Sequence, residues 1–201
     1  MWEIILAAGW PIWPLIIASV IALAIIGERF WVLRSEFIVP ANLLPEVQKW
    51  LSQGGITKET LAKLEQHSPL GQVFASALSN AKNSREVTKE AIEETGRAVA
   101  HNLEKYLPTL GTIATVAPLL GLLGTVIGMV ELFGSFTNSG HDVAQFARGI
   151  SVALYNTAAG IIVAVPAMIA YRYFRGKVDG FLVDMEQQAV KLVEILHGER
   201  N

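Results

Sequence analysis

Hydrophobic residues are concentrated in three long blocks that are separated by segments rich in charge. The blocks run from Ile4 to Gly27, from about Leu107 to Val130, and from Ile150 to Phe174. A helix of about 20 apolar residues is long enough to cross a bilayer. The pattern therefore predicts an all-α integral membrane protein with three transmembrane helices, two of them long and extending into a cytoplasmic helical bundle.

The first block is read as a retained span. Trp10, Trp13 and Trp31 lie toward its ends, where interfacial anchors are common. The alternative, a cleaved signal peptide, needs a basic region at the N-terminus. Glu3 is present instead, and no Lys or Arg precedes Arg29.

The placement of Lys and Arg predicts the orientation. None lies before the first block, and residues 132–149 hold only Arg148, whereas all the others fall between 29 and 105 or from 172 onward. Because cytoplasmic segments carry the excess of basic residues, we expect a periplasmic N-terminus and a cytoplasmic C-terminus. The predicted division is an N-terminal outside segment with the first span, a cytoplasmic helical segment, the second span, a periplasmic loop, the third span and a C-terminal cytoplasmic helix (1–34, 35–106, 107–136, 137–149, 150–174 and 175–201).

Short cytoplasmic helices are expected between the first two spans. Thr57 and Ser68 suit helix N-caps, and Asn83 and Ser84 open a longer helix. That helix has no terminator before Pro108, so we expect it to run directly into the second span. Apolar stripes are predicted on it and on the C-terminal helix (Val87, Ala91, Ala98, Leu103 and Tyr106; Val178, Phe181, Leu182, Met185, Ala189, Leu192 and Leu196).

Small and polar residues share one face in each of the last two spans. Thr125 falls on a face with Pro118, Gly121 and Gly128, and Gly124 forms a close-approach pair with Gly128. Thr157 falls on a face with Ala153, Gly160 and Ala164; Asn156 lies beside it, and Pro166 loosens the same helix. Tight packing of the two spans explains the glycines. A subunit contact or a water-accessible lumen lined by Thr125 and Thr157 explains the hydroxyls better.

Composition excludes several kinds of chemistry. The chain has 201 residues, of which 52% are hydrophobic, with no cysteine and a net charge of −2. No nucleic-acid partner is expected, and the four histidines are not at metal-ligand spacing. No nucleotide loop or nucleophile motif is present, so we expect no enzyme activity, catalytic residue, metal or cofactor. The middle of each span also lacks a carboxylate, Lys or His.

Two stretches together resemble the MotA/TolQ/ExbB proton-channel family, and most closely its ExbB/TolQ branch. They are APLLGLLGTVIGM at 117–129 and GISVALYNTAAGIIVAVPAMIAY at 149–171. The three spans, outer N-terminus and large cytoplasmic segment are similar to that branch. The flagellar-motor branch fits less well, because it has four spans.

The resemblance implies a function. Such subunits form a pentameric ring in the bacterial inner membrane around an ExbD/TolR-type partner, whose single span carries an aspartate. The threonines that match Thr125 and Thr157 line the ring near that aspartate. Proton flow then drives work on the outer membrane through a TonB- or TolA-like protein.

One position departs from the family. A glutamate is common five residues before the match to Thr157, and Val152 stands there in this chain. A proton route through that acid is therefore absent or altered. Because the middle of each span carries no acid, we also keep a second interpretation, a non-conducting oligomeric membrane scaffold. The energised process, and an ExbB-type as against a TolQ-type partner, stay open.

Overall fold

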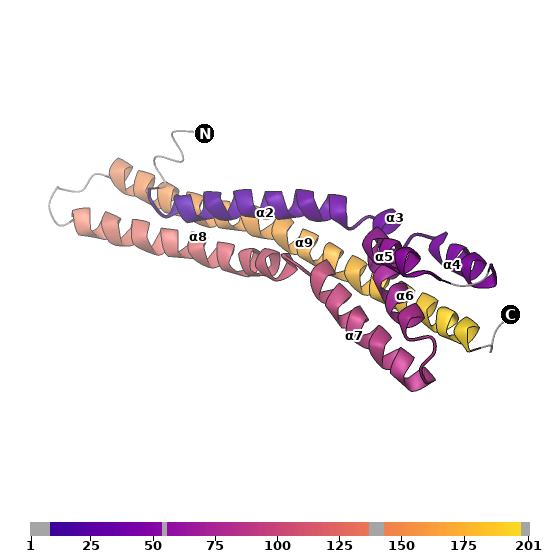
Figure 1. Ribbon diagram of the computed structural model, residues 1–201. Helices are drawn as coiled ribbons and strands as arrows, with labels where there is room; N and C mark the ends of the chain where they lie inside the picture. The colour runs from indigo at the N-terminus through magenta and orange to yellow at the C-terminus, as the bar shows by residue number, and fades with distance from the viewer. Residues whose placement is uncertain (1–8, 54–55, 137–142, 198–201) are drawn as a thin grey trace. The chain divides into compact units, whose positions relative to one another are not determined.

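The computed structural model describes residues 9–53, 56–136 and 143–197, and this part of the chain folds into helices without any strand (Figure 1). The all-α prediction is confirmed. Three helices contain stretches long and apolar enough to cross a membrane, over Ile12–Val32, Leu107–Gly134 and Gly149–Leu196. The helices are α2 (Ile12–Val32), α3 (Ser35–Ile38), α4 (Leu43–Ser52), α5 (Lys58–His67), α6 (Pro69–Ser79), α7 (Arg85–Leu103), α8 (Leu107–Phe136) and α9 (Val143–Leu196).

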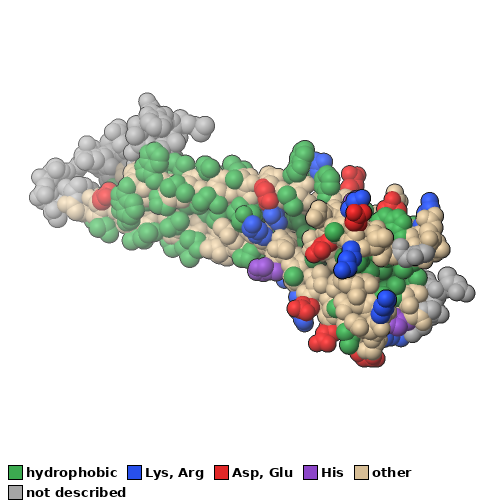
Figure 2. All heavy atoms as spheres, viewed as in Figure 1, with side chains coloured by type: hydrophobic (Ala, Val, Ile, Leu, Met, Phe, Trp, Pro, Cys, Tyr) green, Lys and Arg blue, Asp and Glu red, His purple; other side chains and the backbone are tan. Residues whose placement is uncertain are grey.

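The chain divides into two compact units. One, here called the membrane unit, comprises 1–28 and 106–173, and the other, the helical unit, comprises 29–105 and 174–201. Hydrophobic side chains cover most of the visible face of the membrane unit in Figure 2, whereas most charged side chains belong to the helical unit. This partition follows the sequence, because the uncharged blocks fall in the first unit and the charged segments fall in the second.

The three spans meet in the membrane unit. Leu15 of α2, Ala117 of α8 and Ala164 of α9 are buried against one another, with Leu120, Ala159 and Val163 packed around them. Two of the three central residues are alanines, so the helices approach closely.

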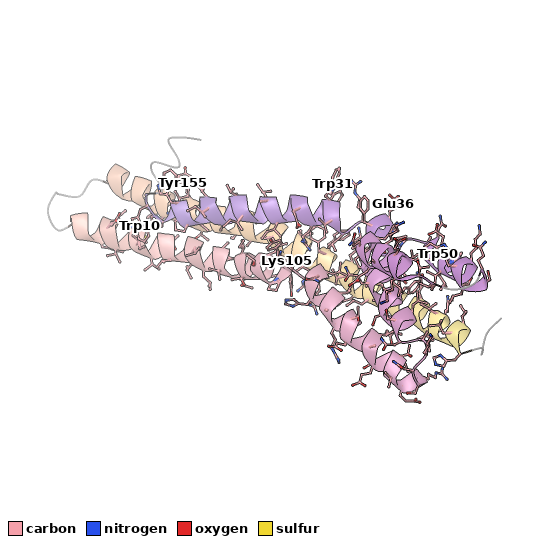
Figure 3. The ribbon with its side chains drawn as sticks, in the orientation of Figure 1. Trp10, Trp31, Glu36, Trp50, Lys105 and Tyr155 are labelled. Carbon is pink, nitrogen blue, oxygen red and sulfur yellow. The ribbon has the colours of Figure 1, made fainter. Side chains whose placement is uncertain are left out.

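Large apolar side chains cover the outer faces of these helices. Many are more than half exposed in the single chain, including Val20, Leu119, Val130, Leu154, Ile162 and Ile169. Tyr155, labelled in Figure 3, projects from α9 and is 41% exposed. Contiguous apolar surface of this extent is buried by lipid or by another subunit rather than left in water.

Ser and Thr caps set the helix starts in the helical unit, as the sequence predicts. The Thr57 hydroxyl accepts from the backbone N–H of Thr60 at 3.3 Å, and Ser68 accepts from Gly71 at 3.0 Å. Ser84 accepts from the N–H of Val87 at 3.4 Å. These caps determine where α5, α6 and α7 begin. Helix α6 packs against both α5 and α7.

The apolar stripe of the C-terminal helix is confirmed, but that of α7 is shifted. Val178, Phe181, Met185, Ala189 and Leu192 are all buried. On α7, by contrast, Val87 and Ala98 are exposed, while Thr88 and Val99 are buried. The Thr88 hydroxyl donates to the backbone oxygen of Asn80 at 2.9 Å, so a polar residue is accommodated where an apolar one was expected.

The continuous helix predicted from the cytoplasmic segment into the second span is wrong. Helix α7 ends at Leu103 and α8 begins at Leu107, with Lys105 in the break (Figure 3). Tyr106 adopts a left-handed backbone with φ of 66°, which a helix cannot continue through. The third span does continue into the C-terminal segment as one helix, α9.

The periplasmic loop predicted over 137–149 overlaps the start of α9. Residues 143–149 already belong to α9, and 137–142 lie outside the described residues.

Candidate functional site

Helices α8 and α9 approach so closely that their backbones touch. A Cβ atom on Gly121 would lie 2.7 Å from the backbone oxygen of Asn156, and one on Gly160 would lie 2.6 Å from that of Ala117. Real Cβ atoms do not come so near to a backbone oxygen. Only glycine fits at these two positions, because neither backbone can move aside without separating the helices.

A buried amide lies beside this backbone contact. Asn156 is 1% exposed, and a Cβ atom on Gly124 would lie 2.6 Å from its Cβ and 2.7 Å from its Cγ. Gly124 is therefore the space into which the Asn156 side chain fits. Toward the other end of the spans, Gly128 faces Ala153, whose Cβ would be 3.3 Å from a Cβ added to the glycine. Three glycines of α8 thus contact α9 within one chain, at Gly121, Gly124 and Gly128.

The two candidate threonines differ in what they bind. The Thr157 hydroxyl donates to the Gly121 carbonyl of α8 at 3.3 Å, so it links the two helices. The Thr125 hydroxyl donates to the Leu122 carbonyl of its own helix at 2.5 Å and is partly exposed. Both protons are held by backbone oxygens, and the oxygen of each hydroxyl keeps lone pairs for a water molecule or a partner.

Two prolines lie inside the spans without ending them. Pro118 is inside α8 and Pro166 inside α9. Each removes the N–H that would bond the carbonyl four residues earlier, so the carbonyls of Ala114 and Ile162 lose that helical bond. Ala164, near Pro166, is buried in the core, whereas Pro166 itself is exposed.

The electrostatics of this contact come from neutral dipoles. Within the described parts of the three spans, the carboxylates Glu28 and Glu131 lie toward the ends rather than the middle. No group of three or more His, Cys, Asp or Glu residues suited to a metal ion occurs among the described residues. The side chain of Val152 lies outside those described. Hydroxyls and one amide can orient water or a partner's acid here, but they do not titrate near neutral pH.

Sequence reasoning missed a second close approach between the same helices. The ring of Tyr171 lies over Gly111, with ring carbons 3.3 to 3.5 Å from where a Cβ would stand. The spacing of residues on α8 could have identified Gly111. It precedes Pro118 by seven residues and Thr125 by fourteen, so it lies on the helix face already identified.

Comparison with known proteins identifies the family of the chain. The family described as the MotA/TolQ/ExbB proton channel family matches residues 65–187, which include the α8–α9 contact. The chain belongs to this family. It is therefore a membrane protein of a proton-channel family, and its relatives carry ExbB names.

Three relatives illustrate the match. A putative biopolymer transport protein ExbB-like 1 of Synechocystis is 30% identical over 171 residues, covering 83% of this chain and 67% of the relative. A putative biopolymer transport protein ExbB homolog of Methanothermobacter thermautotrophicus is 34% identical, covering 69% of this chain and 49% of the relative. Biopolymer transport protein exbB1 of Vibrio cholerae is 28% identical, covering 80% of this chain and 72% of the relative.

Proposed function

We propose that this chain is a ring-forming subunit of a proton channel in the bacterial inner membrane. With an ExbD/TolR-type partner, it uses the proton motive force to energise outer-membrane transport or an envelope process, through a TonB- or TolA-like protein. The N-terminus lies in the periplasm and the C-terminus in the cytoplasm. The observation that carries this proposal is the hydroxyl and amide pair, Thr157 and Asn156, at a charge-free contact between spans of a proton-channel family member.

A homo-oligomer explains the outer faces of the spans. Leu119, Val130 and Ile162 are each at least 62% exposed in a single chain, so lipid tails or neighbouring copies must cover them. Family membership favours neighbouring copies arranged as a ring of five, with membrane lipids around the outside.

A partner that supplies an acid explains the chemistry of the spans. A proton route needs a group that gains and loses a proton, and the middle of these spans has hydroxyls and an amide but no carboxylate, Lys or His. An aspartate on the partner's single span would complete the route, with Thr125 and Thr157 beside it. The position occupied by Val152 offers no second acid, so the partner's aspartate would act alone.

The first experiment is the native mass of the complex, purified in detergent after expression with and without the single-span partner. A ring of five copies that retains partner chains is the expected result. A dimer or monomer that retains no partner would contradict the proposal and favour the non-conducting scaffold.

Thr157→Val then tests the role of the hydroxyl, with Thr157→Ser as the matched control. Valine has the same shape but cannot donate to the Gly121 carbonyl or accept from a partner. We expect Thr157→Val to assemble with the same mass while proton flux into vesicles falls, and Thr157→Ser to retain flux. Full flux in the valine variant would remove Thr157 from the proton route.

A further inference from the structure

An open pocket of about 310 Å³, here called the cavity, is lined by residues of α8 and α9 near the start of α8. Its lining consists of Pro108, Gly111, Thr112, Thr115, Met168 and Tyr171, all within the membrane unit. Three of the six side chains carry hydroxyl groups, although this part of α8 lies inside an apolar span. The volume is enough for several water molecules, since each occupies about 30 Å³ in the liquid.

The hydroxyls in this cavity are set up to accept hydrogen bonds. Thr112 donates to the Pro108 carbonyl at 2.9 Å, and Thr115 donates to the Thr112 carbonyl at 3.0 Å and the Gly111 carbonyl at 3.2 Å. Both side chains are exposed. Because their protons are used within the helix, their oxygens offer lone pairs to water, and the Tyr171 phenol adds a further polar group.

Two residues that line the cavity, Gly111 and Tyr171, lie on the helix faces that carry the two candidate threonines. Gly111, Pro118 and Thr125 recur every seven residues on α8, and Thr157, Ala164 and Tyr171 recur every seven on α9. Residues seven apart share a helix face. Gly111 lies under Tyr171, and Thr157 bonds to Gly121, so the two faces meet along their length.

We propose that this cavity holds water and forms the cytoplasmic half of the proton route. Thr115 is ten residues from Thr125, or about 15 Å along the helix. A proton released near Thr125 and Thr157 would pass along a chain of water molecules that reaches the cavity, and then toward the cytoplasm past Thr115, Thr112 and Tyr171. This inference rests on the proposed channel function and assigns residues to the route that the α8–α9 contact does not include.

Single cysteines test the water content directly, because the chain has none of its own. Thr112→Cys and Thr115→Cys complexes, each purified with the partner and reconstituted into vesicles, are treated with a charged methanethiosulfonate. The control is Ile169→Cys, next to Met168 but 65% exposed on another face of α9. Thiolate forms in water and not in lipid, so we expect the two threonine positions to react roughly tenfold faster than the control.

Equal, slow rates at all three positions would overturn the inference, because a lipid tail or a neighbouring helix would then fill the cavity. Fast labelling combined with reduced proton flux in Thr115→Val, at unchanged native mass, supports it. Fast labelling with full flux in Thr115→Val would also overturn the route, since the water would then carry no current. Conduction through a complex with a dry cavity leaves the proposed function standing, whereas a wet cavity in a complex that never conducts contradicts both.

Discussion

The side chain of Asn156 occupies the volume that a side chain at Gly124 would need. A Cβ atom at position 124 would lie 2.6 Å from the Asn156 Cβ, and the amide is almost completely buried. The polar Asn156 side chain therefore fits at the centre of the helix contact only because Gly124, opposite it, has no side chain. This pairing keeps α8 and α9 close enough for the Thr157 hydroxyl to reach the Gly121 carbonyl.

Gly124→Ala should therefore destabilise the protein, by about 1–3 kcal/mol as overpacking of a close contact usually does. The Asn156 Cβ cannot swing away, because it is fixed to the backbone. Thermal unfolding of the detergent-purified protein measures the change. Gly134→Ala is the matched control. Gly134 lies on the same helix, and a Cβ atom added there would meet nothing within 4 Å.

A second substitution identifies the contact responsible. Asn156→Gly added to Gly124→Ala should recover more of the lost stability than Asn156→Ala, because alanine removes the Cγ at 2.7 Å but keeps the Cβ at 2.6 Å. Equal recovery by both would assign the cost to the amide group instead.

The glycines of the contact should differ in their tolerance of a methyl group. At Gly160 a Cβ would meet the Ala117 backbone oxygen at 2.6 Å, whereas at Gly128 the nearest atom would be the Ala153 Cβ at 3.3 Å. A backbone atom cannot rotate aside, so Gly160→Ala should lower the unfolding temperature clearly more than Gly128→Ala. Gly128→Leu should also lower the unfolding temperature, because its long side chain would push the two helices apart. Equal stability of the Gly160→Ala and Gly128→Ala proteins would mean that the helices shift apart at little cost.

Arg29 should stabilise the helical unit from within. It is 4% exposed, and a guanidinium nitrogen donates to the Leu103 carbonyl at the end of α7 at 3.1 Å. Arg29→Met leaves that carbonyl without this donor, and such losses cost about 1–3 kcal/mol. Hydrogen exchange of the full chain should rise in the last turn of α7.

Arg34→Met is the comparison for that experiment. Arg34 is exposed and stacks over Trp31 at 4.5 Å from the ring centre, a contact that contributes about 0.5–1 kcal/mol at exposed sites. Its removal should leave exchange in α7 unchanged. A rise in both variants would mean that exchange follows the lost positive charge, not the bond to Leu103.

The sequence predicts the parts of this fold that depend on local signals. Long uncharged runs identify the three spans, and Ser or Thr before a helix identifies the starts of α5, α6 and α7. Thr88 shows the limit of such patterns, because its burial depends on a bond to the Asn80 carbonyl. The spacing of hydrophobic residues along α7 does not indicate that Thr88 bonds to Asn80.

For the candidate site, too, the sequence predicts which helix face each residue occupies but not its contacts. Periodicity places Thr125 and Thr157 on faces lined with small residues, but it does not say what each hydroxyl binds. Thr157 bonds across to α8 and Thr125 bonds within its own helix. Pairing between helices depends on their relative rotation and height, which residue spacing along one helix does not contain.

The break between α7 and α8 depends on the backbone conformation of Tyr106. Its φ of 66° is costly for any residue with a Cβ, by about 1–2 kcal/mol, and glycine avoids that cost. The Tyr106 carbonyl accepts the first bond of α8, from the N–H of Leu110 at 3.1 Å, so this backbone shape sets where the helix begins. Tyr106→Gly should therefore be more stable than Tyr106→Ala in thermal unfolding, although alanine is the better helix former. Both variants lose the ring, so their difference isolates the backbone. A more stable alanine variant would show that α7 and α8 can join into one helix when the tyrosine is removed.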